Sequence, residues 1–348
     1  MSTTLTTTPA SAGATRPSPA RSSLEAAATR LALLLTASGG PVDDRADGPG
    51  GLEYEAVVEL RPLTRTAPPA DVWAVDGGQA LVADARCLQL LVTRAARVRF
   101  RDGRCVLEDE GELRAALLGG GEGRAAAAGL GVAVPPDASI DVNLLRDGWE
   151  WEAVERCLLE AEPGALVLVD GDLQPDWRIP STYLADLLTE ASAKRVLLAA
   201  VTKRSSLARG GAPLLGQLEV EAATRFGPRA LWWAAVARTR ADVRAESGAG
   251  LQVVVARLDP DARFAFRVDL PADADPEAAL GALAALSDDA AFPGYPYPLT
   301  VADRLAACPG WLRHEVRLQL DDLFDRAGVP LEVRERAFAD RHDLMERA

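Results

Sequence analysis

Long apolar runs and alternating segments mark the strands of this chain. Residues 72–75 and 165–169 are continuous apolar runs, which predict strands buried on both faces of a sheet. Polar and apolar residues alternate on both sides of the pair 102–103, Asp-Gly, a pattern typical of a β-hairpin because glycine tolerates the positive φ of the turn. With the strand-like segment 79–93, these patterns predict three successive antiparallel strands between residues 71 and 107.

Strand-like and helical segments alternate along the rest of the chain. The expected strands are 53–63, 195–201, 230–237, 251–258 and 264–270, and the expected helices are 23–36, 144–162, 181–192, 275–286, 298–307, 311–324 and 331–346. The glycine- and alanine-rich segment 119–131 is expected to be a flexible loop, since no Lys-Ser/Thr follows its glycines as in a phosphate-binding loop. The pattern predicts an α/β fold, a mixed sheet with flanking helices and helical additions.

Composition divides the chain into a short N-terminal part and one large domain. Residues 1–22 are rich in Ser, Thr, Pro and Ala and are expected to be a disordered tail. Residues 23–50 are expected to form a helix and a linker, and residues 51–348 a single domain. No apolar segment approaches the roughly 20 residues that span a bilayer. We therefore expect a cytoplasmic protein without a membrane segment.

The charge and the rare residues restrict the possible chemistry. The net charge is −13, which excludes nucleic-acid binding through an overall basic surface but allows a local basic groove. The four cysteines are scattered and the histidines number only two. A disulfide framework, a zinc site or a histidine-based metal cluster is therefore not expected.

Two of the predicted strands end in the same local sequence, apolar residues followed by Asp and Gly. Asp76 and Asp170 are the aspartates of these two motifs. Each could mark an ordinary turn after a strand. If the strands are neighbours, however, the two carboxylates converge and repel each other unless a cation lies between them. Ligands that offer only oxygen suit Mn²⁺ or Mg²⁺.

A third carboxylate could come from the helix that precedes the second motif. Glu150 and Glu152 both lie in this segment, and they project about 200° apart on a helix, so we expect only one to face the sheet. A solvated acidic face is the alternative for either residue.

Three further features are candidates for substrate contacts. Lys203 follows a predicted strand, where its charge could hold a phosphate; the alternative is an exposed lysine without a role. Tyr295 and Tyr297 could stack on unpaired bases, or could simply pack in a rigid connector before a helix. Asp303 would lie about one turn into that helix and could supply a late ligand.

The densest basic stretch of the chain lies in the predicted hairpin. Arg97, Arg99 and Arg101 share one face of a strand, since side chains alternate with a period of two. They could form a local track for DNA, and ordinary surface charge is the alternative.

The order of these motifs resembles the NurA nuclease family over roughly residues 50–340. The resemblance rests on the two Asp-Gly motifs, on Lys203 after its strand and on the segment 295–299, Tyr-Pro-Tyr-Pro-Leu. It implies a ribonuclease-H-like core and a manganese-dependent nuclease acting on DNA ends and single strands, as a 5′–3′ exonuclease and single-strand endonuclease. It also implies a nucleoid-associated homodimer that works with a hexameric ATPase of the HerA type in recombinational repair of double-strand breaks.

Carried over by position, the resemblance makes Asp76 and Asp170 metal ligands and Glu150 the acidic residue between them. Lys203 and Asp303 match later positions of the family. Members commonly have Ser after the Gly of both motifs, whereas this chain has Gly78 and Asp172. Asp172 therefore adds a carboxylate that could alter metal binding or act as a ligand itself.

Two other functions fit parts of the sequence. The segment 170–172, Asp-Gly-Asp, resembles the nucleophile motif of haloacid-dehalogenase-like phosphatases, in which Asp170 would attack phosphorus, although the usual Thr shortly after is absent. A non-catalytic dimeric adaptor of an ATPase ring is the third possibility, and it would need no metal site between Asp76 and Asp170.

Overall fold

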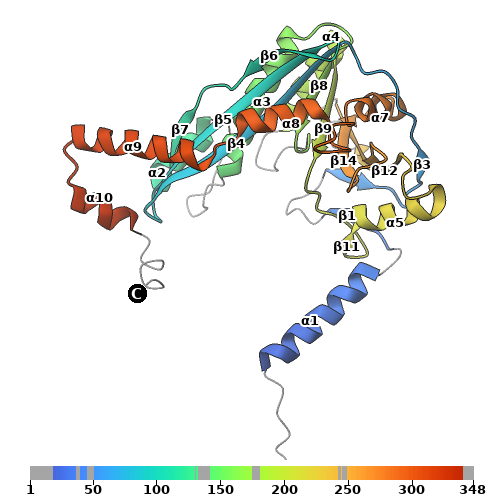
Figure 1. Ribbon diagram of the computed structural model, residues 1–348, viewed down its shortest axis with the longest axis horizontal. Helices are drawn as coiled ribbons and strands as arrows, with labels where there is room; N and C mark the ends of the chain where they lie inside the picture. The colour runs from blue at the N-terminus through green and yellow to red at the C-terminus, as the bar shows by residue number, and fades with distance from the viewer. Residues whose placement is uncertain are drawn as a thin grey trace, which may run out of the picture.

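A large mixed β-sheet with helices on both faces forms the body of the protein (Figure 1). The structure is a computed structural model, and it describes residues 19–36, 40–44, 51–129, 131, 142–174, 181–241, 244 and 249–339. The predicted α/β fold is confirmed. The expected tail lies outside the described residues up to residue 18, but residues 19–22 already belong to a helix.

Eleven strands of the described part of the chain form the main sheet. In spatial order they are β2 (Leu52–Tyr54), β12 (Trp232–Thr239), β13 (Leu251–Arg257), β14 (Phe266–Pro271), β9 (Leu197–Thr202), β8 (Leu166–Asp170), β4 (Asp71–Asp84), β5 (Gln89–Arg101) and β6 (Arg104–Asp109), with β3 (Arg61–Pro62) beside β12 and β7 (Arg114–Leu118) beside β5. Strand β8 runs parallel to both β4 and β9, and the other pairs are antiparallel. The carboxyl end of β8 therefore lies beside the middle of the long strand β4, and the carboxyl end of β9 lies on the other side of β8.

The predicted hairpin between β5 and β6 is confirmed. Asp102 and Gly103 have φ angles of 48° and 73°, so both central residues of the turn are left-handed. This combination matches the twist of a two-residue hairpin, and Asp-Gly is a favoured sequence for it. The hairpin completes the predicted antiparallel series β4–β5–β6.

Apolar side chains on the two faces of the sheet form separate cores. Helices α7 (Pro276–Ala285) and α8 (Tyr297–Ala306) cover one face, where they pack on alternate residues of β4, β8 and β9. Helices α3 (Val142–Glu160) and α4 (Ser181–Lys194) cover the opposite face. Each of these strands is thus buried on both sides, as their continuous apolar runs predict.

Smaller units surround this body. Helix α5 (Leu214–Phe226) packs against β12 and β13 near a small sheet of β1 (Val42–Asp44), β10 (Leu207–Arg209) and β11 (Ala212–Pro213). Helix α1 (Pro19–Thr36) stands apart from the main sheet, and α9 (Gly310–Arg326) and α10 (Leu331–Phe338) extend beyond α8 (Figure 1). Several large apolar side chains on these outer helices are exposed, namely Leu24, Leu31, Leu33, Leu35, Trp311, Leu318, Leu323, Leu331 and Val333.

Several local predictions were wrong. Strand β1 lies within the expected linker, and segment 53–63 divides into β2 and β3. The expected glycine-rich loop contains helix α2 (Gly120–Gly129), because its run of alanines has high helix propensity. Helix α5 was not predicted, and α10 ends at Phe338, earlier than expected.

Candidate active site

Asp76 and Asp170 lie on neighbouring parallel strands. The parallel pairing of β4 and β8 ends at Val75 and Val169, so the two aspartates follow directly after the last paired residues. Asp76 does not end its strand, as the sequence suggested, because β4 continues to Asp84 through its pairing with β5. The continuously buried first part of the strand, residues 71–76, ends at Asp76.

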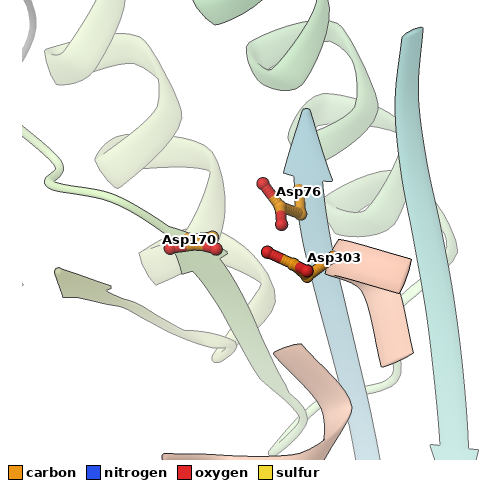
Figure 2. A group of neighbouring side chains, drawn as sticks. All are labelled: Asp76, Asp170 and Asp303. Atoms are coloured by element: carbon orange, nitrogen blue, oxygen red, sulfur yellow. The ribbon is translucent and has the colours of Figure 1, made fainter. Parts of the chain in front are cut away.

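A third aspartate joins these two from the helical layer. One carboxylate oxygen of each of Asp76, Asp170 and Asp303 lies within 4.8 Å of the others, and we call these three residues the aspartate trio. Figure 2 shows the carboxylates of Asp76 and Asp303 turned toward each other, with Asp170 at the end of its strand. Asp303 comes from α8, where the sequence placed it as a late ligand.

The ammonium group of Lys203 lies among the carboxylates. Its Nζ is 2.5 Å from Oδ2 of Asp170 and 2.5 Å from Oδ1 of Asp303. Burial lowers the pKa of Lys203, but the charge and hydrogen bonds of Asp170 and Asp303 outweigh this and raise it above its ordinary value. Lys203 is therefore charged, and it neutralises part of the negative charge of the trio.

The trio is nevertheless poor in positive charge. Burial, followed by the charges of Asp170 and Glu150, raises the pKa of Asp76 to about 9. Burial also raises the pKa of Glu150 to about 8, although the neighbouring Arg146 opposes this. Without a further cation, burial and mutual repulsion favour the protonated forms of these two carboxyl groups.

The choice between the two helical glutamates is decided by the orientation of α3. Glu150 is 7% exposed and faces the sheet, and its Oε1 lies 2.9 Å from Nε of Arg146. Glu152 instead forms an ion pair with Arg114, with 3.0 Å between its Oε2 and Nη1 of the arginine. Glu150 is not a member of the aspartate trio, but its charge contributes to the raised pKa of Asp76.

The glycine after Asp76 makes room for Glu150. A Cβ at Gly77 would lie 2.0 Å from Oε1 of Glu150, far inside van der Waals contact. The backbone N–H of Gly77 donates a hydrogen bond of 2.7 Å to Oδ1 of Asp76. The missing side chain thus lets Glu150 approach the strand.

The turn after Asp170 is fixed by β9. The N–H of Gly171 donates to the carbonyl of Val201 at 3.1 Å, and the hydroxyl of Thr202 donates to the carbonyl of Gly171 at 2.7 Å. The next carboxylate, Asp172, turns toward Arg267, whose Nη1 is 3.5 Å from its Oδ2. Asp172 therefore lies outside the trio, although the sequence left it open as a ligand.

The two tyrosines favour the packing alternative. Tyr295 is 1% exposed and packs against Phe266 at a ring distance of 5.4 Å, so in this position its ring cannot stack on a base. Burial, followed by the charges of Asp170 and Asp76, raises the pKa of its hydroxyl group. Tyr297 makes an edge contact with Phe100 at 5.1 Å.

The three hairpin arginines share a face, but they are paired with carboxylates. Nε of Arg97 lies 2.8 Å from Asp109, and Nε of Arg99 lies 2.7 Å from Asp71. Arg101 pairs with Glu162. The three arginines are therefore ion-paired, and DNA could bind along this face only by displacing their partners.

Arg146 is the residue of the site that sequence reasoning missed. It lies four residues before Glu150, and this spacing brings two side chains together on a helix, so the pair could have been found from the sequence.

Comparisons with known proteins rest on structure alone. No family model matches the sequence, and no curated protein matches it. The crystal structure of the NurA nuclease from Sulfolobus solfataricus matches with a TM-score of 0.54 and 14% identity, over 79% of this chain and 88% of that chain. The chain has a NurA-like fold.

Two other solved structures match with TM-scores below 0.5. A second NurA structure has a TM-score of 0.47 at 8% identity, covering 75% of this chain and 91% of that chain. The catalytic domain of human endonuclease V has a TM-score of 0.37 at 16% identity, covering 90% of this chain and 100% of that chain. The predicted ribonuclease-H-like mixed sheet is confirmed, and identities this low establish the fold and not the chemistry.

None of the helices that the structure describes is both long and apolar enough to cross a membrane.

The raised pKa of Asp76 predicts an unusual pH dependence of stability. Between the ordinary value of 3.8 and about 9, the carboxyl group is ionised in the unfolded chain and protonated in the folded protein, so the free energy of unfolding falls as pH rises. Asp76→Asn removes this effect and keeps an acceptor for the N–H of Gly77. We expect the metal-free variant to melt several degrees above the wild type near pH 8 and close to it near pH 4. Calorimetric melting curves of both proteins test this, and equal melting temperatures at both pH values would contradict it.

Proposed function

We propose that this protein is a metal-dependent nuclease that hydrolyses phosphodiester bonds of DNA. The observation that carries the proposal is the aspartate trio with Lys203, placed beside the carboxyl ends of parallel strands on a NurA-like fold. Such a site offers oxygen ligands for a cation and an ammonium group for a phosphate.

The residues of the trio fit a divalent metal ion. Asp76, Asp170 and Asp303 offer only oxygen ligands, which suit Mn²⁺ or Mg²⁺ better than zinc. Burial, with repulsion from nearby carboxylates, raises the pKa values of Asp76 and Glu150, and a divalent ion would offset that repulsion. We assign Asp76, Asp170 and Asp303 as ligands, and Glu150 as a neighbouring carboxylate that can join them.

Each residue of the site has a distinct task in this proposal. A divalent metal supplies Lewis acidity and a water of lowered pKa when bound. Asp76 and Asp170 hold the ion on the rigid sheet, and Asp303 closes the site from the helical layer. Lys203 can leave the carboxylates that the metal neutralises and pair with a phosphate oxygen, where its charge stabilises the negative charge that develops.

The finer role follows the NurA-like fold. We propose that the enzyme acts on DNA ends and single strands, as a 5′–3′ exonuclease and single-strand endonuclease. We also propose that Mn²⁺ is its metal, and that it resects double-strand breaks for recombinational repair with a HerA-type ATPase. The support is the fold and the order of the sequence motifs.

The two rival functions meet specific difficulties. In a phosphatase of the haloacid-dehalogenase kind, Asp172 would act as the acid beside Asp170, but it is paired with Arg267. That function also leaves Asp76 without a role. A non-catalytic adaptor gives no reason for three carboxylates and a lysine to converge in one place.

We expect the substitution Asp170→Asn to abolish nuclease activity, and Asp172→Asn is its matched control. The substitution removes a ligand charge, so we expect a loss of at least about 100-fold, the scale on which losing a partner of a metal ligand already acts. Asp172→Asn, two residues away and outside the trio, should change the rate little. Degradation of labelled single-stranded DNA with Mn²⁺ measures both. Wild-type activity in Asp170→Asn would contradict the assignment of Asp170 as a metal ligand. Activity of the wild type without any divalent metal would contradict the metal dependence.

We further propose that the protein is a homodimer, and that the exposed apolar side chains of the outer helices take part in the contact. Leu31 and Leu35 are 56% and 53% exposed, and Trp311 is 66% exposed. Light scattering should give about twice the chain mass of 36.8 kDa. A variant that combines Leu31→Glu with Leu35→Glu should lower the measured mass. The single variant Trp311→Glu should lower it as well. A wild-type protein of single-chain mass would contradict the proposal.

A further inference from the structure

We infer that Gly78 and Arg94 form a docking pair for the C-terminal end of helix α8, and that they act as positioning residues for Asp303. The inference rests on the proposed function, in which Asp303 is a metal ligand. Gly78 and Arg94 face each other across the β4–β5 ladder, two residues beyond Asp76. The two residues are therefore part of the same rigid sheet as the first ligand.

Both residues of the docking pair contact the last turn of α8. A Cβ at Gly78 would lie 1.8 Å from the carbonyl oxygen of Ala306, so only glycine allows the helix to lie this close to the strand. Arg94 donates from Nε to the carbonyl of Ala306 at 3.2 Å and from Nη2 to the carbonyl of Ala307 at 2.5 Å. Its Nη1 pairs with Glu110 at 3.0 Å, which holds the guanidinium group in place.

These contacts involve backbone carbonyl groups of the kind that every helix leaves unpaired at its C-terminal end. The last four carbonyl groups of an α-helix lack partners within the helix, and they carry partial negative charge. An arginine that donates to them satisfies the carbonyls and interacts favourably with the helix dipole. The side chain of Arg94 is only 11% exposed, so solvent weakens this interaction little.

The docked turn is connected directly to Asp303. The N–H of Ala307 donates to the carbonyl of Asp303 at 2.9 Å, and the carbonyl of Ala307 accepts from Arg94. Ala307 therefore connects Arg94 to Asp303 through two hydrogen bonds. The side chain of Asp303 is 54% exposed and is therefore not fixed by burial. Asp76 and Asp170 are placed by strand pairing, whereas Asp303 depends on where its helix lies. The docking pair supplies that placement, and it explains why glycine stands at position 78.

Metal titration of the DNA-free protein tests the inference through a double-mutant cycle. The variants are Arg94→Met, Asp303→Asn and the two combined, and calorimetric Mn²⁺ titration gives the affinity of each. Arg94→Met should weaken Mn²⁺ binding by about 10-fold, the lower end of the loss seen for outer partners of metal ligands. If Arg94 acts through Asp303, the combined variant should bind as weakly as Asp303→Asn alone. Losses that multiply in full, or an unchanged affinity in Arg94→Met, would overturn the inference.

Two further variants separate positioning from a general loss of stability. Arg97→Met removes a similarly buried arginine of the same strand, whose ion pairs are with Asp109 and Glu160, and it should leave the Mn²⁺ affinity unchanged. Arg94→Lys keeps a cation near the helix end and should recover most of the affinity. A loss in Arg97→Met equal to that in Arg94→Met would show a structural effect only and overturn the inference.

Hydrogen exchange of the metal-free protein keeps this test apart from the proposed function. Amides in the last turn of α8 should exchange faster in Arg94→Met than in Arg97→Met. A wild-type protein that binds no Mn²⁺ overturns the metal-dependent function, while the exchange rates still decide whether Arg94 docks the helix. Equal exchange in the two variants would overturn the docking itself.

Discussion

Mutual repulsion of carboxylates is the constraint on which this structure depends. Asp76, Asp170 and Asp303 place oxygens within 4.8 Å of one another, with Asp76 buried, Asp170 half-buried and Asp303 exposed, and Glu150 adds a fourth carboxyl group nearby. Such a group is stable only if some members stay protonated or a cation joins them. The protein uses both devices: the pKa values of Asp76 and Glu150 are raised, and Lys203 places its ammonium group between the other two carboxylates. A site held in this way is prepared for a divalent ion.

The sheet topology provides the convergence, and the helices complete it. Parallel pairing of β4 with β8 and of β8 with β9 brings Asp76, Asp170 and Val201, which lies two residues before Lys203, to one line across the sheet. Asp303 reaches this line from α8, which the docking pair of Gly78 and Arg94 holds against β4 and β5. Rigid strands thus place two carboxylates of the trio, and a docked helix places the third.

The sequence predicted the parts that depend on local pattern. The continuous apolar runs of β4 and β8, the Asp-Gly hairpin and the positions of Asp76, Asp170, Lys203 and Asp303 follow from short-range signals and from a resemblance in motif order. Contacts between distant segments did not follow, and Arg94 with Ala306, 212 residues apart, is the clearest example. The ion pairs of the hairpin arginines could not be predicted for the same reason, because partners such as Glu160 and Glu162 come from another part of the chain.

The most direct measurement for the central claim is diffraction from crystals of the protein soaked in Mn²⁺, with data collected at the manganese absorption edge. We predict an anomalous peak between Asp76, Asp170 and Asp303, with carboxylate oxygens at about 2.1 Å, a distance typical of small divalent ions with oxygen ligands. We also predict that Lys203 has moved away from at least one of its two carboxylates. Crystals that diffract well but show no peak at the trio, with Lys203 still between Asp170 and Asp303, would contradict the account.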